Sequence, residues 1–447
     1  MSILFNYVIF VICFMGRPRK NQSVATGYSP KKIQSLDSLE DIVGETDVLW
    51  GAILRRFTRL SRIYGFEKVE TPLLEDYRLY ENFYKTSPKF LENFLKVEIR
   101  KQERAVVRGD FLPGLLRAYY QRKIYEKSPL SKWAASGPTV RLDENENLIS
   151  DYQFNFEVFG QFNHLTEAQV IGSVWDFLQS LGLKDSVLEI NSLGKEECQQ
   201  AYSQTLQDYL MSKKYQLCDN CNEHLQGRVL NVFRCCNLDC QALLSEAPAV
   251  LDFLDEESKK HFTNILEALD ELGVPYQLNP LYAGPDGSGK TNLVIKSKLK
   301  GETVVLGEGG YHEGLMQNLC GKSLCCFGFS GSLSKIHELL EANKTVVNRE
   351  QNSDVFLVPL GELASKRALR LFRDLTAEKI SVYDHFGNVG VKNQLKQAET
   401  FHAPVALIMG QKEAMEEMVI LRDVKSGMQE IISYDKIVQE VKKRLGR

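Results

Sequence analysis

Residues 284–291 read Gly-Pro-Asp-Gly-Ser-Gly-Lys-Thr and match every letter of the phosphate-binding pattern G-x-x-x-x-G-K-[ST]. In a nucleotide-binding loop this pattern follows a strand and opens a helix, whose first N–H groups bind the phosphates. Here residues 292–298 alternate and are rich in β-branched side chains, and a Lys300-Gly301 turn leads into a second apolar run at 303–306. We therefore expect a glycine-rich turn followed by a β-hairpin, which argues against a P-loop fold.

The composition is typical of a soluble globular chain with two or three domains, since the 447 residues are 43% hydrophobic and 25% charged. The formal net charge of −3 gives no overall attraction to nucleic acid, so any RNA binding must rest on a local basic face. We expect a cytoplasmic protein with reduced cysteines that binds no DNA and is not held in a membrane.

The first residues form an apolar stretch, 1–15, that is too short for a membrane span. Its basic residues follow the apolar run, at 17–20, whereas in a signal peptide they precede it. Two interpretations stay open: a true start at Met15, and a short membrane anchor. In both, we expect residues 1–34 to be an arm outside the fold.

Six of the ten cysteines fall within one stretch of some forty residues. Cys218 and Cys221, followed by Cys236 and Cys240, have the spacing of a four-thiolate zinc site, with Cys235 as an alternate ligand. The other interpretation is that these are reduced cysteines that simply pack. A catalytic zinc is disfavoured because every available ligand is a sulfur and no coordination position is left open.

Periodicity predicts a mixed α and β core. Helical spacing of apolar residues predicts helices at 44–62 and 167–181, and alternation predicts strands at 66–71, 152–160 and 186–190. The cysteine-rich segment, about 198–273, is mostly helical in pattern, as an inserted domain would be.

A polar break at 348–353 separates a second region, in which strands and helices alternate. This order predicts a βαβαβ domain with three layers and a largely parallel sheet. Its expected elements are strands at 355–360, 380–383 and 404–409 and helices at 362–377 and 391–401.

These segments resemble, in order and across nearly the whole chain, histidyl-tRNA synthetase, a class II aminoacyl-tRNA synthetase. The resemblance implies a six-stranded antiparallel core over 35–347 with the helical insertion, a homodimer across residues 64–75, and an anticodon-binding α/β domain over 353–447. The motifs that carry the resemblance are 38–42, 64–75, Leu188–Gly194, Gly307–Leu315, Val358–Gly361 and Leu421–Gly427.

The resemblance also assigns roles to single residues. Arg141 stands where the family has the arginine that binds the α-phosphate of ATP, and Gln153 and Glu157 match substrate-binding positions. Arg108 remains in the segment that holds the amino-acid ammonium, and Asp110 there replaces a glutamate. These residues are expected to be remnants of an amino-acid and ATP site.

Other family positions have changed. The motif 3 arginine is Lys335, which keeps the charge but loses the planar fork, and the loop 142–147 is acidic where the family is basic. The family's Arg-Gly-Leu-Asp-Tyr-Tyr loop has become 283–288, with Ala283 in place of its arginine and Asp286 kept. Losing a charge stabiliser and polar partners for histidine is expected to impair histidine activation.

Three functions follow from the resemblance. The leading hypothesis is a paralogue with degenerate catalytic motifs that binds tRNA or regulates, with Lys392 and Lys396 on the RNA-binding face. The second is a divergent but active histidine–tRNA ligase, which would use ATP and Mg²⁺. The third is a regulatory subunit of histidine biosynthesis, although the retained C-terminal region counts against it.

Overall fold

The computed structural model describes residues 35–36, 39, 41–43, 45–85, 88–100, 103–143, 145–235, 237–284, 289–312, 316–317, 319, 321–322, 324–344, 354–384, 390–400 and 403–446. The expectations for residues 1–34, including the choice of start, lie outside these residues. Within the described part of the chain, no helix is both long and apolar enough to cross a membrane.

A large mixed sheet forms the centre of the N-terminal region. Its six central strands pair antiparallel throughout, which confirms the expected antiparallel core, and a short strand pairs in parallel at each edge. In spatial order the strands are β1 (Glu67–Lys68), β5 (Leu130–Leu142), β6 (Leu148–Gly160), β11 (Cys326–Ser332), β10 (Glu302–Tyr311), β9 (Asn292–Leu299), β7 (Val187–Asn191) and β8 (Gln277–Leu278).

Side-chain alternation along β6 assigns the two faces of this sheet. Phe154, Phe156 and Val158 lie in one apolar cluster with Phe57, and the ring centroid of Phe57 is 5.2 Å from that of Phe156. Truncating a buried phenylalanine to alanine typically costs about 3–5 kcal/mol, so such residues dominate the stability of this layer. The helices that cover this face are α1 (Glu45–Ile63), α6 (His164–Ser180), α10 (Glu256–Glu271) and α12 (Leu333–Ala342).

The alternate residues of β6, among them Gln153, Asn155 and Glu157, lie on the opposite face. A second apolar cluster packs on this face around Phe111 and Phe159. The elements around it are α2 (Tyr77–Phe83), α3 (Pro88–Leu91), α4 (Leu112–Gln121), α5 (Ile124–Lys127) and a small sheet of β2 (Leu74–Asp76), β4 (Glu103–Val107) and β3 (Lys96–Arg100). The polar residues of β6 therefore form the floor of a candidate site.

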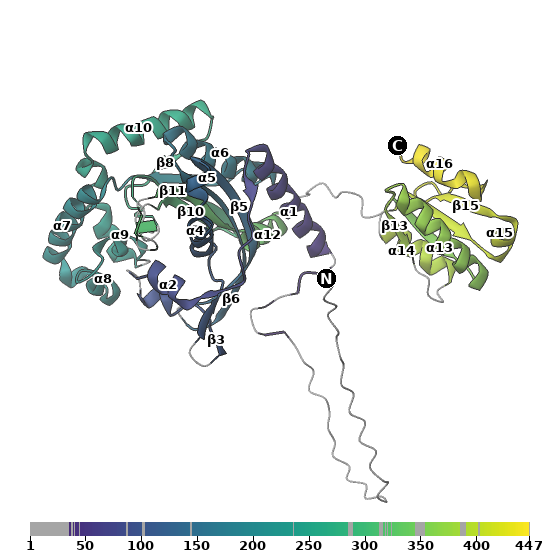
Figure 1. Cartoon of the computed structure of the whole chain (residues 1–447), viewed down its shortest axis with the longest axis horizontal. Helices are drawn as coiled ribbons and strands as arrows, with labels where there is room; N and C mark the ends of the chain where they lie inside the picture. The colour runs from purple at the N-terminus through teal and green to yellow at the C-terminus, as the bar shows by residue number, and fades with distance from the viewer. Residues whose placement is uncertain are drawn as a thin grey trace, which may run out of the picture.

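The cysteine-rich segment is helical, as its pattern indicates, and Figure 1 shows its helices gathered beside the large sheet. It has an apolar cluster of its own, which includes Tyr202, Leu206 and Val232. Its elements are α7 (Glu196–Ser212), η1 (Lys214–Gln216), α8 (Asp219–His224), η2 (Val229–Arg234), α9 (Leu238–Ser245) and η3 (Val250–Phe253), followed by α10.

The C-terminal region contains a five-stranded sheet in the order β13-β12-β14-β15-β16. The first three strands are parallel, as predicted, but β15 and β16 add an antiparallel extension that the expected βαβαβ pattern lacked. The elements are β12 (Val355–Pro359), α13 (Glu362–Ala377), β13 (Val382–Asp384), α14 (Val391–Thr400), β14 (Val405–Met409), α15 (Gln411–Glu416), β15 (Met418–Asp423), β16 (Gln429–Ser433) and α16 (Tyr434–Arg444).

Alternate residues of β12 separate the two cores of this sheet. Val355 and Leu357 pack with α13 and α16, whereas Phe356 and Val358 pack with Ala398 of α14. The sheet therefore has helices on both faces, which gives three layers. The predicted boundaries at 347 and 353 fall outside the described residues, so the division of the chain there stays a prediction.

Candidate functional site

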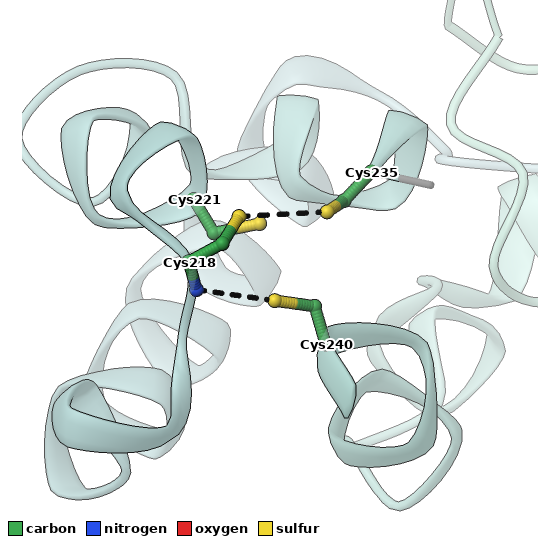
Figure 2. Close-up of side chains that lie close together, drawn as sticks. All are labelled: Cys218, Cys221, Cys235 and Cys240. Carbon is green, nitrogen blue, oxygen red and sulfur yellow. Dashed lines mark hydrogen bonds between the residues drawn. The ribbon is translucent and has the colours of Figure 1, made fainter. Parts of the chain in front are cut away.

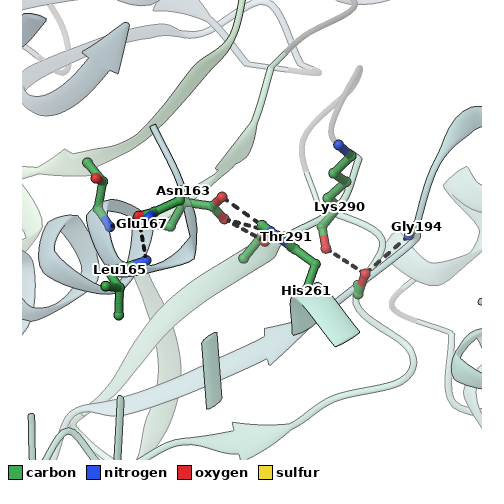
Figure 3. A network of polar contacts seen from close by, with 9 residues as sticks. Asn163, Leu165, Glu167, Gly194, His261, Lys290 and Thr291 are labelled. Carbon is green, nitrogen blue, oxygen red and sulfur yellow. Dashed lines mark hydrogen bonds and ion pairs between the residues drawn. The ribbon is translucent and has the colours of Figure 1, made fainter. Parts of the chain in front are cut away.

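The segment that matches the phosphate-binding pattern leads into a strand. β9 begins at Asn292 and pairs with β10, so the predicted hairpin is confirmed and the segment leads into a strand, where a phosphate-binding loop would open a helix. Thr291, whose hydroxyl would bind Mg²⁺ in a P-loop, is buried and donates to Oε2 of Glu167 at 2.8 Å. Nε2 of His261 lies 3.2 Å from the other oxygen of Glu167, as Figure 3 shows. The Thr291 hydroxyl is thus part of a buried structural contact.

The start of the same segment is held by the cysteine-rich helices. Gly284 has φ +70°, and a Cβ there would lie 2.2 Å from Oδ1 of Asn292, so the position requires glycine. Nη2 of Arg234 donates to the Gly284 carbonyl at 3.0 Å. Asp286, predicted as a substrate-binding remnant, lies outside the described residues.

Arg108 is buried under the loop that precedes α4. Its Nη1 donates to the Thr71 carbonyl at 2.9 Å, and Nε and Nη2 donate to the Pro138 carbonyl at 3.1 and 3.0 Å. The guanidinium also stacks 3.9 Å from the Phe111 ring centroid, and burial lowers its pKa. In the described structure the predicted ligand-binding arginine therefore joins the segment between β1 and β2 to strand β5.

Asp110 accepts hydrogen bonds from its own surroundings. Oδ2 accepts from the Tyr84 hydroxyl at 2.8 Å, and Oδ1 accepts from the Leu112 amide at 3.1 Å. Burial, followed by the charge of Asp110, raises the pKa of Tyr84, whereas the positive charge of Arg141 opposes the rise. The three predicted remnants Arg108, Asp110 and Arg141 thus lie around one end of α4.

Glu157 is fully buried at the centre of the sheet floor. Nδ2 of Asn155 approaches Oε1 at 3.5 Å, and the Cys326 thiol donates to Oε2 at 3.6 Å. Burial raises the pKa of Glu157 to about 8, and the charge of Asp110 adds to that rise. The carboxyl group is therefore largely protonated at neutral pH.

Room for this carboxyl group comes from the neighbouring strand. Gly328 of β11 is the direct partner of Glu157, and a Cβ on Gly328 would lie 1.7 Å from Oε2. Gln153, two pleats along the same face, accepts from the Phe111 amide at 2.9 Å. Both predicted β6 remnants therefore face the α4 side of the sheet.

The two predicted catalytic remnants, Arg141 and Lys335, are both exposed. Arg141 is exposed near the end of β5, where its backbone bridges to Phe94. Lys335 is exposed in the first turn of α12, and its Nζ donates to the Val305 carbonyl at 3.1 Å. Lys335 is thus linked to the bulge of β10, at Val305–Gly307.

Sequence reasoning missed the neutral groups beside Glu157. Asn155 also donates to Ser330 across the β6–β11 pair, and the alternation of β6 alone would have placed it on the Glu157 face. His312 is buried, with its amide on the Cys326 carbonyl at 2.7 Å, and burial lowers its pKa to about 4. No sequence signal brought Cys326 to this site, because it reaches Glu157 only through the pairing of β11 with β6.

Four cysteine side chains converge among the inserted helices (Figure 2). The sulfur atoms of Cys218, Cys221, Cys235 and Cys240 all lie within 4.8 Å of one another. The cluster could therefore hold a metal ion. Cys236, predicted as a ligand, lies outside the described residues, and in the described cluster its neighbour Cys235 takes that place.

The two predicted RNA-binding lysines share one face of α14. Lys392 and Lys396 are exposed, whereas Gln394 and Ala398 of the same helix are fully buried. This is the pattern of a helix that packs on a sheet with its basic residues outward.

Comparisons with known proteins agree with this architecture. Residues 354–444 match the family model described as "Anticodon binding domain". A histidine–tRNA ligase of Dehalococcoides mccartyi is 27% identical over 416 residues, covering 92% of this chain and 100% of that protein. One from Geobacter sulfurreducens is 28% identical over 401 residues, covering 89% and 96%.

Solved structures give the same result. The apo histidyl-tRNA synthetase of S. aureus matches with a TM-score of 0.76 at 25% identity, covering 92% of this chain and 100% of that one. A Bacillus halodurans structure, described as an ATP phosphoribosyltransferase regulatory subunit/histidyl-tRNA synthetase, matches in fold with a TM-score of 0.62 at 16% identity, covering 85% and 99%. The chain is therefore a homologue of the histidyl-tRNA synthetases, with a class II synthetase core and a C-terminal anticodon-binding domain.

Proposed function

We propose that this protein is a histidyl-tRNA synthetase homologue that is impaired in histidine activation and acts by binding tRNA, as a regulatory paralogue. One observation carries the proposal. Ala283 stands where the resemblance places a catalytic arginine, and it packs, partly buried, against the apolar cluster of the inserted helices. A methyl group at this position supplies no charge to the reaction.

The missing charge matters because of the chemistry that the family name implies. Attack of a carboxylate on the α-phosphate of ATP develops negative charge, which fixed cationic groups must stabilise. Lys335 donates to a backbone carbonyl, and Arg108 donates to two. These two cations are therefore engaged with the protein itself, which supports an impaired site.

The protonation state of Glu157 points the same way. A carboxylate binds an amino-acid ammonium through its negative charge, and burial raises the pKa of Glu157 to about 8. Binding an ammonium group here at neutral pH would first require the loss of a proton. The Glu157 side chain is better suited to neutral hydrogen-bonding partners.

The tRNA part of the proposal rests on the C-terminal region. The relatives are named as ligases of tRNA, and their anticodon-binding family model matches residues 354–444. On α14, Lys392 and Lys396 are exposed on one face, where lysines can neutralise phosphates. We propose this face as the RNA contact.

We also propose a homodimer and a cytoplasmic location. The resemblance places the dimer contact at residues 64–75. Leu73 and Leu74 in this segment are 48% and 44% exposed, as apolar residues of a subunit interface are in a single subunit. The cysteines that the structure describes are free thiols, which suits a reducing compartment.

Zinc is the ion that we propose for the four-cysteine cluster. Four thiolates suit tetrahedral Zn²⁺ and leave no coordination position open for water, so the ion would stabilise the fold and take no part in catalysis. ATP and Mg²⁺ would be needed only by an active ligase.

A second candidate is that active ligase. It is favoured by the match over 100% of a relative named histidine–tRNA ligase and by the presence of Arg141, Gln153 and Glu157 at the family's positions. The regulatory-subunit alternative has only a fold-level match at 16% identity.

Histidine-dependent ATP–pyrophosphate exchange separates the two candidates. The full chain is assayed beside the Dehalococcoides mccartyi ligase under the same conditions. Exchange at least about 10⁴-fold slower supports the proposal, and exchange comparable with the ligase overturns it. A gel-shift assay with total tRNA tests the other half, and no shift at low salt would remove the RNA-binding claim.

A further inference from the structure

We infer that Cys218, Cys221, Cys235 and Cys240 form one tetrathiolate metal site. We also infer that the bound ion fixes the path of residues 281–284, the segment that includes Ala283. The inference builds on the zinc binding proposed above and adds the identity of the fourth ligand and a consequence for the neighbouring segment.

The sulfur positions fit a tetrahedral ion. With Zn–S bonds of about 2.3 Å, sulfur atoms at tetrahedral corners lie about 3.8 Å apart. Sγ of Cys218 lies 3.7 Å from Sγ of Cys235, and all four sulfurs lie within 4.8 Å of one another. The small adjustment needed is a rotation of side chains, because the backbone already brings the four residues together.

Backbone amides support the thiolates. The Cys218 amide donates to Sγ of Cys240 at 3.3 Å, and the Asn237 amide donates to Sγ of Cys235 at 3.4 Å. Such N–H···S contacts offset the negative charge of a tetrathiolate site and orient its ligands. The first of these contacts joins the amide of one cysteine pair to a sulfur of the other, as a single site shared by two chain segments requires.

Cys235 is the fourth ligand because of its position in the chain. It follows directly after η2, and its sulfur points toward Cys218 (Figure 2). The ligand spacing is therefore Cys-x₂-Cys and Cys-x₄-Cys. In this assignment Cys236 is the matched control: the same residue type, one position along.

The elements around the cluster are too short to be stable alone. α8 has 6 residues, α9 has 8, and η2 is a 3-10 helix of 6, whereas isolated helices below about 12 residues are marginal in water. A structural zinc site contributes directly to folding free energy in such segments. The ion would thus add to the apolar cluster that already packs these short elements together.

The same cluster reaches the segment at the degenerate site. Arg234, the residue before Cys235, donates to the Gly284 carbonyl at 3.0 Å. Leu281 and Ala283 pack against the apolar cluster that includes Cys221 and Cys240. Fixing Cys235 on the ion therefore fixes Arg234, and through it the carbonyl of Gly284.

Metal analysis of the full chain tests the ligand set. We expect about one zinc per chain by mass spectrometry, and cobalt substitution giving the intense ultraviolet absorption of thiolate-to-cobalt charge transfer. Cys235→Ser should lose most of the metal, and Cys236→Ser should keep it. A metal-free protein, a disulfide between Cys218 and Cys235, or metal loss in Cys236→Ser alone would overturn the assignment.

Hydrogen exchange tests the effect on residues 281–284. Removing zinc with a chelator, or introducing Arg234→Ala, should speed amide exchange in the peptide that spans these residues, and a peptide over 403–409 should be unchanged. Arg234→Ala should retain zinc, which separates the contact from the metal site. Unchanged exchange after complete zinc removal would overturn the coupling but not the metal site. Histidine activation is measured in a separate assay. The results for zinc binding and hydrogen exchange therefore neither support nor overturn the proposed function.

Discussion

The face of the large sheet that carries Glu157 and the helix that carries Lys392 use their polar groups in opposite ways. On the sheet face, Arg108 donates to backbone carbonyls and Gln153 accepts from the Phe111 amide. On α14, Lys392 and Lys396 are both exposed. Both regions keep the family fold, because buried apolar residues maintain it. The comparison teaches that function depends on which polar groups can still reach a ligand.

The largest expected effect concerns catalysis. If the sheet face has lost its chemistry, histidine-dependent ATP–pyrophosphate exchange should be about 10⁴-fold or more below that of an intact ligase, whereas tRNA binding through the C-terminal region should persist. Exchange as fast as that of an intact ligase would contradict this contrast between the two regions. A chain that activates histidine but no longer binds tRNA would contradict it as well.

The next largest effect is expected on the free energy of unfolding, which should change separately in the two regions. Phe156→Ala in the large sheet should cost about 3–5 kcal/mol, and Leu407→Ala in the C-terminal sheet about 2–5 kcal/mol. All three tryptophans, Trp50, Trp133 and Trp175, lie in the N-terminal region.

Tryptophan fluorescence during urea unfolding should therefore shift with Phe156→Ala and not with Leu407→Ala, whereas circular dichroism should report both. The apolar clusters support this, since among the described residues each cluster draws on one region alone. A fluorescence shift in Leu407→Ala would show that the two regions unfold together.

The pH dependence of stability should come from the sheet face. Burial raises the pKa of Glu157 from 4.5 to about 8, so between these values the folded chain binds more protons than the unfolded chain. Stability from this group is complete below about pH 4.5 and falls as the pH rises to about 8, by at most about 5 kcal/mol. Glu157→Gln cannot titrate, so the variant should lose this decline in urea unfolding measured from pH 5 to pH 8. An unchanged decline would assign it to another group.

The smallest effect is expected on α14. Lys392→Ala with Lys396→Ala should weaken tRNA binding by several-fold and reduce the slope of log affinity against log salt by about 1 to 2, since two phosphate contacts are removed. Lys436→Ala, at an exposed position of α16 in the same region, is the matched control. Equal losses in the two variants would place the RNA contact elsewhere, and the contrast with the sheet face would fail.

Local patterns predicted much of the fold. The hairpin after Thr291 and the helix over 362–377 follow from periodicity, which short segments determine by themselves. The antiparallel strands β15 and β16 escaped prediction because they complete an edge that only the assembled sheet presents.

The surroundings of Glu157 could not be predicted for a similar reason. Cys326 lies 169 positions away in the chain, and a strand register across such a distance leaves no mark in either segment alone. The cysteine cluster was found by its spacing, which left Cys235 and Cys236 as alternatives, and the described structure places the Cys235 sulfur beside those of Cys218, Cys221 and Cys240. Adjacent residues share a spacing signal and differ only in direction.

The hydrogen bond between Thr291 and Glu167 bears on mutational tolerance at the segment that resembles a phosphate loop. Glu167 is 1% exposed, so an apolar residue at 291 would leave its carboxylate short of a donor. In a saturation scan scored only by folding, position 291 should accept serine and reject valine, whereas position 290 should accept most side chains. The final letter of the motif would then be kept because its hydroxyl donates to a buried carboxylate.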